Sequence, residues 1–271
     1  MSDPPPLFAE AAFRLREACE VVVFSGAGIS AESGIPTFRD EGGLWEAFPA
    51  DQFATWQGLM QVGVREPQRL AAFIRAVLTP IVAARPNAAH LAIADLERYL
   101  PVTVVTQNID RLHQDAGSTT VHEVHGSLFE IVTKSGRFER LLSRPELASV
   151  VAGLDRIRQR RIVLPRLLWA VRPLLGIGRR GLYRPRLVLF GSAMAEPDWT
   201  AAREAAARCD LVLQVGCSGV VLPAATIPEI ARAAGATVVN VDPEAGGGDL
   251  DLPGSAVRIV PALVEAAFAE R

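Results

Sequence analysis

The sequence is poor in cysteine and lysine and has no long apolar run, and these shortages narrow the class of protein. Its three cysteines, Cys19, Cys209 and Cys217, are odd in number and scattered, which argues against a disulfide framework or a metal knuckle. No apolar run approaches the roughly 20 residues of a transmembrane helix. The acidic, proline-rich start MSDPPPLFAE is not typical of a signal peptide. We therefore expect a reducing, cytoplasmic setting.

Charge is nearly balanced over the 271 residues, at −2, and this does not indicate a nucleic-acid-binding protein. The balance hides a basic segment, residues 137–186, in which thirteen arginines face three acidic residues. Its net charge is +10, against −12 for the rest of the chain. We interpret the segment first as a basic, mainly helical insertion that packs one face on the main domain. A patch for an anionic partner and a membrane-surface element are the alternatives.

Apolar runs and helical patterns alternate along most of the chain, which predicts an α/β fold with a doubly wound, parallel, Rossmann-like sheet. We expect this Rossmann-like domain over residues 1–136 and 187–271, with 137–186 as a small second domain. Strands are expected at 21–24, 102–105, 187–190, 211–215, 237–241 and 257–260. Helices are expected at 8–19, 67–83, 88–99, 199–208, 224–234 and 261–269, and Ser143-x-x-Glu146 predicts one more helix start.

Polar or glycine-rich segments follow the first, second, fourth and fifth of these strands, and we expect these four strand ends to share one rim of the sheet. Glycines at 26 and 28 follow the first strand, where the backbone can turn sharply and approach a phosphate, with a helix expected from near Ser30. Ligands of such sheets bind beyond the carboxyl ends of the strands. The other three segments are TQNID at 106–110, GCS at 216–218, and Asn240 with its neighbours.

Taken together, these motifs resemble those of the sirtuins, the NAD-dependent protein deacylases. The resemblance spans residues 21–242 and includes GAGIS and GIPTFR near the start, PNAAH at 86–90, TQNID, His125-Gly126-Ser127, RPRLVLFG at 184–191, and GCS. It implies a reaction in which the acyl oxygen of an acyl-lysine attacks the ribose of NAD, nicotinamide leaves, and O-acyl-ADP-ribose is formed. It also implies an acyl-lysine protein or peptide as the substrate.

The resemblance assigns roles to individual residues. His125 matches the general base, a task that suits a side chain whose reference pKa lies near 6.5. Asn108 and Asp110 match the pair that positions nicotinamide and ribose, while His90, His113 and His122 are interpreted as structural. The expected NAD-binding residues are Gly26, Ala27, Gly28, Ser30, Ile35, Phe38, Arg39, Gln107, Ile109, Gly216, Ser218 and Asn240. For Ile35 and Phe38, plain core packing is an equal alternative.

The chain departs from most sirtuins where these carry a small zinc module. The positions expected for the first cysteine pair hold Thr133 and Gly136, and residues 126–186 contain no cysteine or histidine. Structural zinc needs four such ligands, so we predict no zinc and no other metal. The Y-x-x-R pair of desuccinylating members is also missing from residues 72–78, which favours an apolar acyl group, although Arg75 lies nearby.

Two other functions remain open on the same scaffold. The lost zinc module and the altered loop at Ser192 are compatible with an ADP-ribosyltransferase or NAD hydrolase, which would cleave the same bond for a different acceptor. A non-enzymatic NAD-sensing module is the other alternative. The presence of His125, Asn108 and Asp110 together argues against the non-enzymatic module, and the deacylase is the first of the three hypotheses.

Overall fold

The computed structural model describes residues 6–37, 43–157, 163–178, 181–244 and 246–269, which form two compact units. The first unit comprises residues 1–33, 85–124 and 195–271, and the second comprises 34–84 and 125–194. The second unit is thus built from two segments and extends on both sides of the expected insertion at 137–186. A boundary of this kind was not visible in the sequence, because residues 34–84 are not distinguished by charge or composition.

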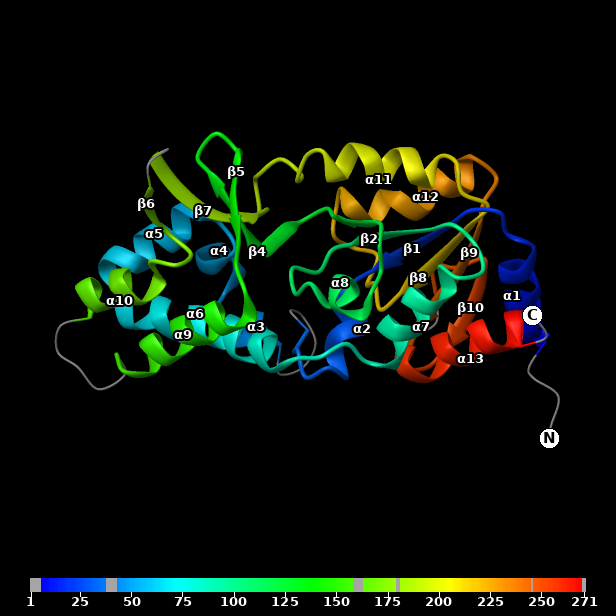
Figure 1. Ribbon diagram of the computed structural model, residues 1–271, viewed down its shortest axis with the longest axis horizontal. Coiled ribbons are helices and arrows are strands. Elements are labelled where there is room, and N and C mark those ends of the chain that lie inside the picture. Colours follow the sequence, from blue (N-terminus) through cyan, green and yellow to red (C-terminus); the bar gives the residue numbers. More distant parts are fainter. Residues whose placement is uncertain (1–5, 38–42, 158–162, 179–180, 245, 270–271) are drawn as a thin grey trace. The chain divides into compact units, whose positions relative to one another are not determined.

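A six-stranded parallel sheet forms the centre of the first unit, which confirms the expected α/β fold (Figure 1). The strand order is β10-β9-β8-β1-β2-β3. The strands are β1 (Val21–Ser25), β2 (Val102–Thr106), β3 (Val121–Glu123), β8 (Leu211–Val215), β9 (Thr237–Asp242) and β10 (Leu250–Pro253). All five residues of β1 and of β8 are buried, as expected for central strands of a parallel sheet covered on both faces.

Helices cover both faces of this sheet, with α11 and α12 on one side and α1, α7 and α13 on the other (Figure 1). Alternate strand residues such as Val23, Leu213 and Val239 pack into one core with Leu15, on α1, and Ile93, on α7. The helices of this unit are α1 (Pro6–Glu17), α2 (Gly28–Ala31), α7 (Ala88–Leu96), α8 (Leu112–Ala116), α11 (Asp198–Ala206), α12 (Ile227–Ala233, preceded by a 3₁₀ turn, Ala224–Thr226) and α13 (Ala256–Phe268).

The second unit combines helices with a four-stranded antiparallel sheet of order β5-β4-β7-β6. Its strands are β4 (Gly126–Thr133), β5 (Phe138–Leu141), β6 (Gly176–Gly178) and β7 (Gly181–Leu187). Its helices are α3 (Leu44–Ala47), α4 (Ala50–Phe53), α5 (Trp56–Arg65), α6 (Pro67–Ala83), α9 (Arg144–Asp155) and α10 (Leu164–Val171). The basic segment therefore contributes strands as well as helices. Helix α9 begins at the expected capping box, where Ser143 and Glu146 bond each other's backbone N–H groups.

Two expected strands are wrong, and several strands were missed. Leu187 is the last residue of β7, which pairs antiparallel with β4 and is not part of the parallel sheet, and residues 188–190 lie beyond that strand. Residues 257–260 lie in α13, because a short apolar run cannot be distinguished from a buried helical turn by its pattern. Of the missed strands, β3 and β10 are the short edge strands of the parallel sheet and carry polar residues, as edges often do. The others, β4 to β7, form the antiparallel sheet of the second unit.

Candidate functional site

The glycine-rich loop after β1 packs directly on the loop after β8. These strands are neighbours, yet the chain leaves β1 toward β2 on one side and leaves β8 toward β9 on the other. The loops thus meet at the switch point where parallel sheets bind ligands. Gly28 N donates to Gly216 O at 3.0 Å, and a Cβ on Gly28 would lie 2.7 Å from the Cα of Gly216. Only glycine fits this contact.

Helix α2 begins at Gly28, two residues before the expected start, and is only four residues long. Its residue Ser30 is buried and joins the loop after β1 to the TQNID segment after β2. The Ser30 hydroxyl donates to Asp110 Oδ2 at 2.7 Å and lies 3.2 Å from Asn108 Nδ2, which also donates to Gly26 O at 3.0 Å. The structure therefore brings three predicted site residues, Ser30, Asn108 and Asp110, into one hydrogen-bonded cluster.

Asp110 also anchors its own segment. Its Oδ1 accepts the backbone N–H of Leu112 at 2.9 Å, at the start of α8, and its side chain is buried. The intervening residue, Arg111, has a left-handed backbone with φ of 65°, which is uncommon outside glycine. The bonds of Asp110 hold this turn in place.

We expect Asp110→Ala to destabilise the protein by about 1–3 kcal/mol, because the N–H of Leu112 would stay buried without its acceptor. Asp110→Asn keeps one amide oxygen for that N–H and should cost less. Urea unfolding measures both. Asp95→Ala, which removes an exposed carboxylate on α7, is the control and should change stability by no more than about 0.5 kcal/mol. Equal losses for Asp110→Ala and Asp95→Ala would contradict the anchoring role.

A chain of buried polar side chains lies behind this cluster, and only its histidines were noted in the sequence. Ser25, the last residue of β1, donates to Thr106 Oγ1 at 2.8 Å, and its hydroxyl lies 2.9 Å from His113 Nε2. Thr106 Oγ1 in turn accepts the backbone N–H of Asn108 at 3.1 Å. The signal for Ser25 and Thr106 was available, since both are polar residues that end otherwise apolar strands. They fix the backbone from which Asn108 projects.

His113 and His90 form a buried pair, with ring centroids 4.9 Å apart. Burial lowers the pKa of His90 to about 4, and burial together with the positive charge of a protonated His90 lowers the pKa of His113 well below its ordinary value. His90 also contacts Asn87, which caps α7. Both rings are therefore neutral in the folded protein at neutral pH and serve a structural role, as interpreted from the sequence.

This pair should make stability depend on pH. In the unfolded chain the two imidazoles take up protons as pH falls through about 6.5, while the folded protein keeps them neutral, so the unfolded state is favoured. We expect the free energy of unfolding to fall between pH 6.5 and 4, by about 3 kcal/mol from His90 alone. Denaturant unfolding at several pH values should show that the free energy of unfolding falls less steeply with decreasing pH in His90→Asn than in the natural protein. His122→Asn removes a histidine paired with Asp198 and is the control.

The other predicted NAD-binding residues of this unit differ in exposure. Ala27, Gln107 and Ile109 are half-buried, and Ser218 is exposed. Asn240 is buried in β9, where its amide already donates to Gly246 O and Asp251 Oδ1, both at 3.0 Å, and accepts from Gln214 at 3.0 Å. Asn240 thus ties the end of the sheet to the loop before β10.

The remaining predicted residues belong to the second unit or lie outside the described residues. His125 is half-buried in the turn that precedes β4, and its carbonyl accepts the N–H of Val188 at 2.9 Å. Ile35 is half-buried in the second unit. Phe38 and Arg39 lie outside the described residues.

The positions expected for zinc-binding cysteines form a hydrogen-bonded turn. Thr133 N donates to Arg137 O at 2.8 Å, and Gly136 N donates to Thr133 O at 2.9 Å. Gly136 has φ of 81°, a conformation that glycine adopts readily. Within the residues that the structure describes, no group of three His, Cys, Asp or Glu side chains is arranged to hold a metal ion.

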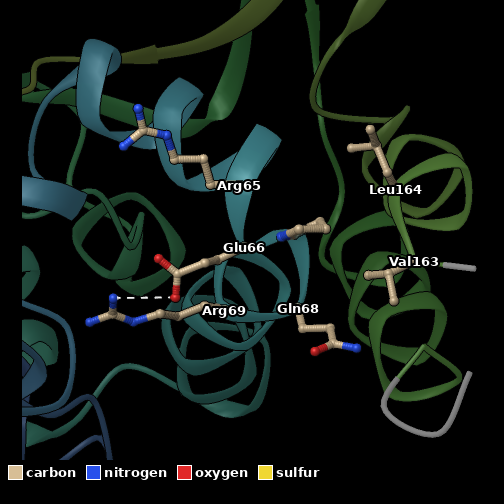
Figure 2. A pocket seen from close by; sticks show the side chains of 7 residues that line it. Arg65, Glu66, Gln68, Arg69, Val163 and Leu164 are labelled. Carbon is tan, nitrogen blue, oxygen red and sulfur yellow. Dashed lines mark ion pairs between the residues drawn. The ribbon is translucent and has the colours of Figure 1, made fainter. Parts of the chain in front are cut away.

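A hollow of about 470 Å³ lies in the second unit, where α5 meets α6 beside the start of α10 (Figure 2). Its lining includes Glu66, which pairs with Arg69 at 3.6 Å, together with Val163 and Leu164. None of the predicted site residues lines this hollow. The hollow is therefore not part of the candidate site.

Comparison with known proteins agrees with the sequence motifs. Residues 26–223 match the family model described as the Sir2 family. The NAD-dependent protein deacylase of Desulfosudis oleivorans is 41% identical over 243 residues, covering 88% of this chain and 86% of the relative. A Sir2 homologue solved with NAD has a TM-score of 0.75 and 28% identity, covering 95% of this chain and 93% of its own. A third, Sir2Af2 bound to a myristoylated histone peptide, has a TM-score of 0.68, 30% identity and 96% coverage of both chains.

Proposed function

Since the chain belongs to the Sir2 family, we propose a reaction for it and the residues that carry that reaction. It is an NAD-dependent protein-lysine deacylase, which releases nicotinamide and O-acyl-ADP-ribose and frees the lysine. The observation that carries the assignment is the hydrogen-bonded cluster of Ser30, Asn108 and Asp110 beside the glycine contact at the switch point of the sheet.

The residues of the first unit fit NAD. Gly26, Gly28 and Gly216 carry no side chains of their own, so a phosphate can approach the backbone at these positions closely. The Asn108 amide can both donate and accept, which suits a carboxamide, and the Asp110 carboxylate can stabilise positive charge that develops on the ribose. NAD supplies the glycosidic bond that is broken. The further NAD contacts that we propose are Ala27, Ser30, Ile35, Phe38, Arg39, Gln107, Ile109, Ser218 and Asn240.

His125 is the proposed general base, which removes a proton from a ribose hydroxyl at neutral pH. His90 and His113 are less suited to this role. Their burial keeps both rings away from a substrate and lowers their pKa values. His122 is held by Asp198 at 3.3 Å and has a structural role.

The acyl group that we propose is apolar, from acetyl to longer chains. Two observations in the second unit support this. Arg75 pairs with Asp155 of α9 at 3.9 Å, and Phe73, two residues before it on α6, packs with Phe48 and Phe53 at ring distances of 5.4 and 4.8 Å. A carboxylated acyl chain buried in such surroundings would need a partner charge.

We also propose that the small unit is stable without zinc. Backbone hydrogen bonds in the turn at Thr133–Gly136, and the pairing of β4 with β5 and β7, connect the segments that metal ligands would otherwise hold together. A cytoplasmic setting is supported by Cys19, Cys209 and Cys217, which are all free thiols.

A mass-spectrometric assay over a series of acyl-lysine peptides tests the function. With NAD, peptides carrying acetyl or longer apolar acyl groups should yield O-acyl-ADP-ribose, whereas succinyl peptides should react far more slowly. Nicotinamide release without any acyl peptide, with ADP-ribose appearing free or on protein, would instead identify a hydrolase or transferase. No turnover with any peptide would sink the deacylase assignment.

A further inference from the structure

Helix α10 in the second unit is apolar on both its inner and its outer face. Leu167, Ala170 and Val171 are buried, as expected for the inner face. The outer face carries Leu168 and Trp169, whose exposures are 61% and 59%. A helix that is apolar all round is normally covered by something on its outer side.

Among the residues that the structure describes, the charged side chains of this outer face are basic. Arg166 and Arg172 are exposed, and neither forms an ion pair with any residue that the structure describes. The Arg172 guanidinium lies 4.4 Å from the centroid of the Trp169 ring, so the aromatic and cationic groups form one patch. Acids of the same segment are used elsewhere, since Glu146 pairs with Arg140 and Asp155 with Arg75.

A second exposed apolar feature lies next to the end of α10. Ile177 and Leu182 are opposite each other in the β6–β7 pair and are 83% and 53% exposed. The next residue, Tyr183, donates its hydroxyl to Arg172 O at 2.6 Å, and its ring fills the space beside Gly176. This bond fixes the strand pair to the last turn of α10.

We propose that the outer face of α10, with Leu168, Trp169, Arg166 and Arg172, is a docking face for an anionic lipid bilayer, and that the exposed Ile177 and Leu182 add a second apolar contact. The segment around them has a net charge of +10, which complements an anionic surface. Its apolar groups project from a helix and from a strand pair, and a bilayer accepts such projections without a matching concave shape. Tryptophan and arginine beside leucine are the residues that membrane interfaces favour. No helix among the described residues is long and apolar enough to span a membrane, so the contact is peripheral.

Co-sedimentation of the full chain with lipid vesicles tests this proposal. Binding is expected to vesicles of phosphatidylcholine that contain phosphatidylglycerol, to be weak with phosphatidylcholine alone, and to decrease with salt. Leu168→Ser with Trp169→Ser, and separately Arg166→Gln with Arg172→Gln, should each reduce binding by about tenfold or more. Tryptophan fluorescence should shift when the protein binds the vesicles, and this shift should be lost in Trp169→Phe.

Matched controls replace exposed groups elsewhere. Met60→Ser with Val64→Ser removes apolar side chains of α5 that are 72% and 77% exposed, and Arg14→Gln with Arg98→Gln removes two exposed arginines of the first unit. These variants should bind vesicles as the natural protein does, and every variant should keep deacylase activity on a peptide in solution. Absence of binding to anionic vesicles, equal loss in the controls, or light scattering that shows a dimer broken by Leu168→Ser with Trp169→Ser would each overturn the proposal.

Discussion

His125→Ala is expected to reduce the formation of O-acyl-ADP-ribose by about 10²–10⁴-fold, the usual contribution of a general base. The fold should survive this change. In the structure, the β4–β7 pairing uses the backbone carbonyl of His125, which accepts from Val188 N, and alanine keeps that carbonyl. Loss of activity would then be a loss of chemistry and not of structure.

The step at which the reaction stops in His125→Ala distinguishes a general base from a merely structural histidine. We propose that His125 acts after nicotinamide has left, so exchange of labelled nicotinamide into NAD, in the presence of acyl peptide, should persist in His125→Ala while product formation is lost. His122→Ala, three residues earlier, is the control and should keep both activities within a few-fold. Product formation near the natural rate in His125→Ala would show that another group is the base.

The sequence predicted the first unit well because parallel sheets have a simple pattern. Continuous apolar runs flanked by glycine or polar residues mark buried parallel strands, and β1, β2, β8 and β9 were all found in this way. Since the carboxyl ends of parallel strands share one rim, the clustering of Ser30, Asn108 and Asp110 followed from their positions after β1 and β2. Family resemblance then supplied the roles that geometry alone does not assign.

The second unit was harder to predict because its contacts connect distant segments. Strand β7 pairs with β4, some fifty residues earlier in the sequence. Helix α6 packs on α9, although the two helices are far apart in the sequence. The arginine-rich residues 137–186 were interpreted as mainly helical, and β5, β6 and β7 were therefore missed. The buried polar chain of Ser25 and Thr106 was missed for a related reason, since its partner His113 lies on a different element.

The contact between the two glycine loops leads to the second large prediction. Gly216 has φ of 59°, and a Cβ there would lie 2.4 Å from the backbone nitrogen of Ile29 and 2.6 Å from the carbonyl carbon of Gly28. Backbone atoms cannot move aside as a side-chain end can. We expect Gly216→Ala to cost about 2–5 kcal/mol of stability, the sum of a left-handed alanine and an overpacked contact.

Gly219, three residues later in the same loop, is a natural control for this prediction. It also has a left-handed backbone, with φ of 68°, but a Cβ there would meet nothing within 4 Å. Gly219→Ala should therefore lower the free energy of unfolding only by the cost of a left-handed alanine, about 1–2 kcal/mol. Urea unfolding compares the two variants, and calorimetric titration with NAD should show weaker binding for Gly216→Ala, because the loop after β1 must shift away from its position on the loop after β8. If Gly216→Ala proved no more costly than Gly219→Ala and bound NAD normally, the close packing of these loops would not be what shapes the NAD site.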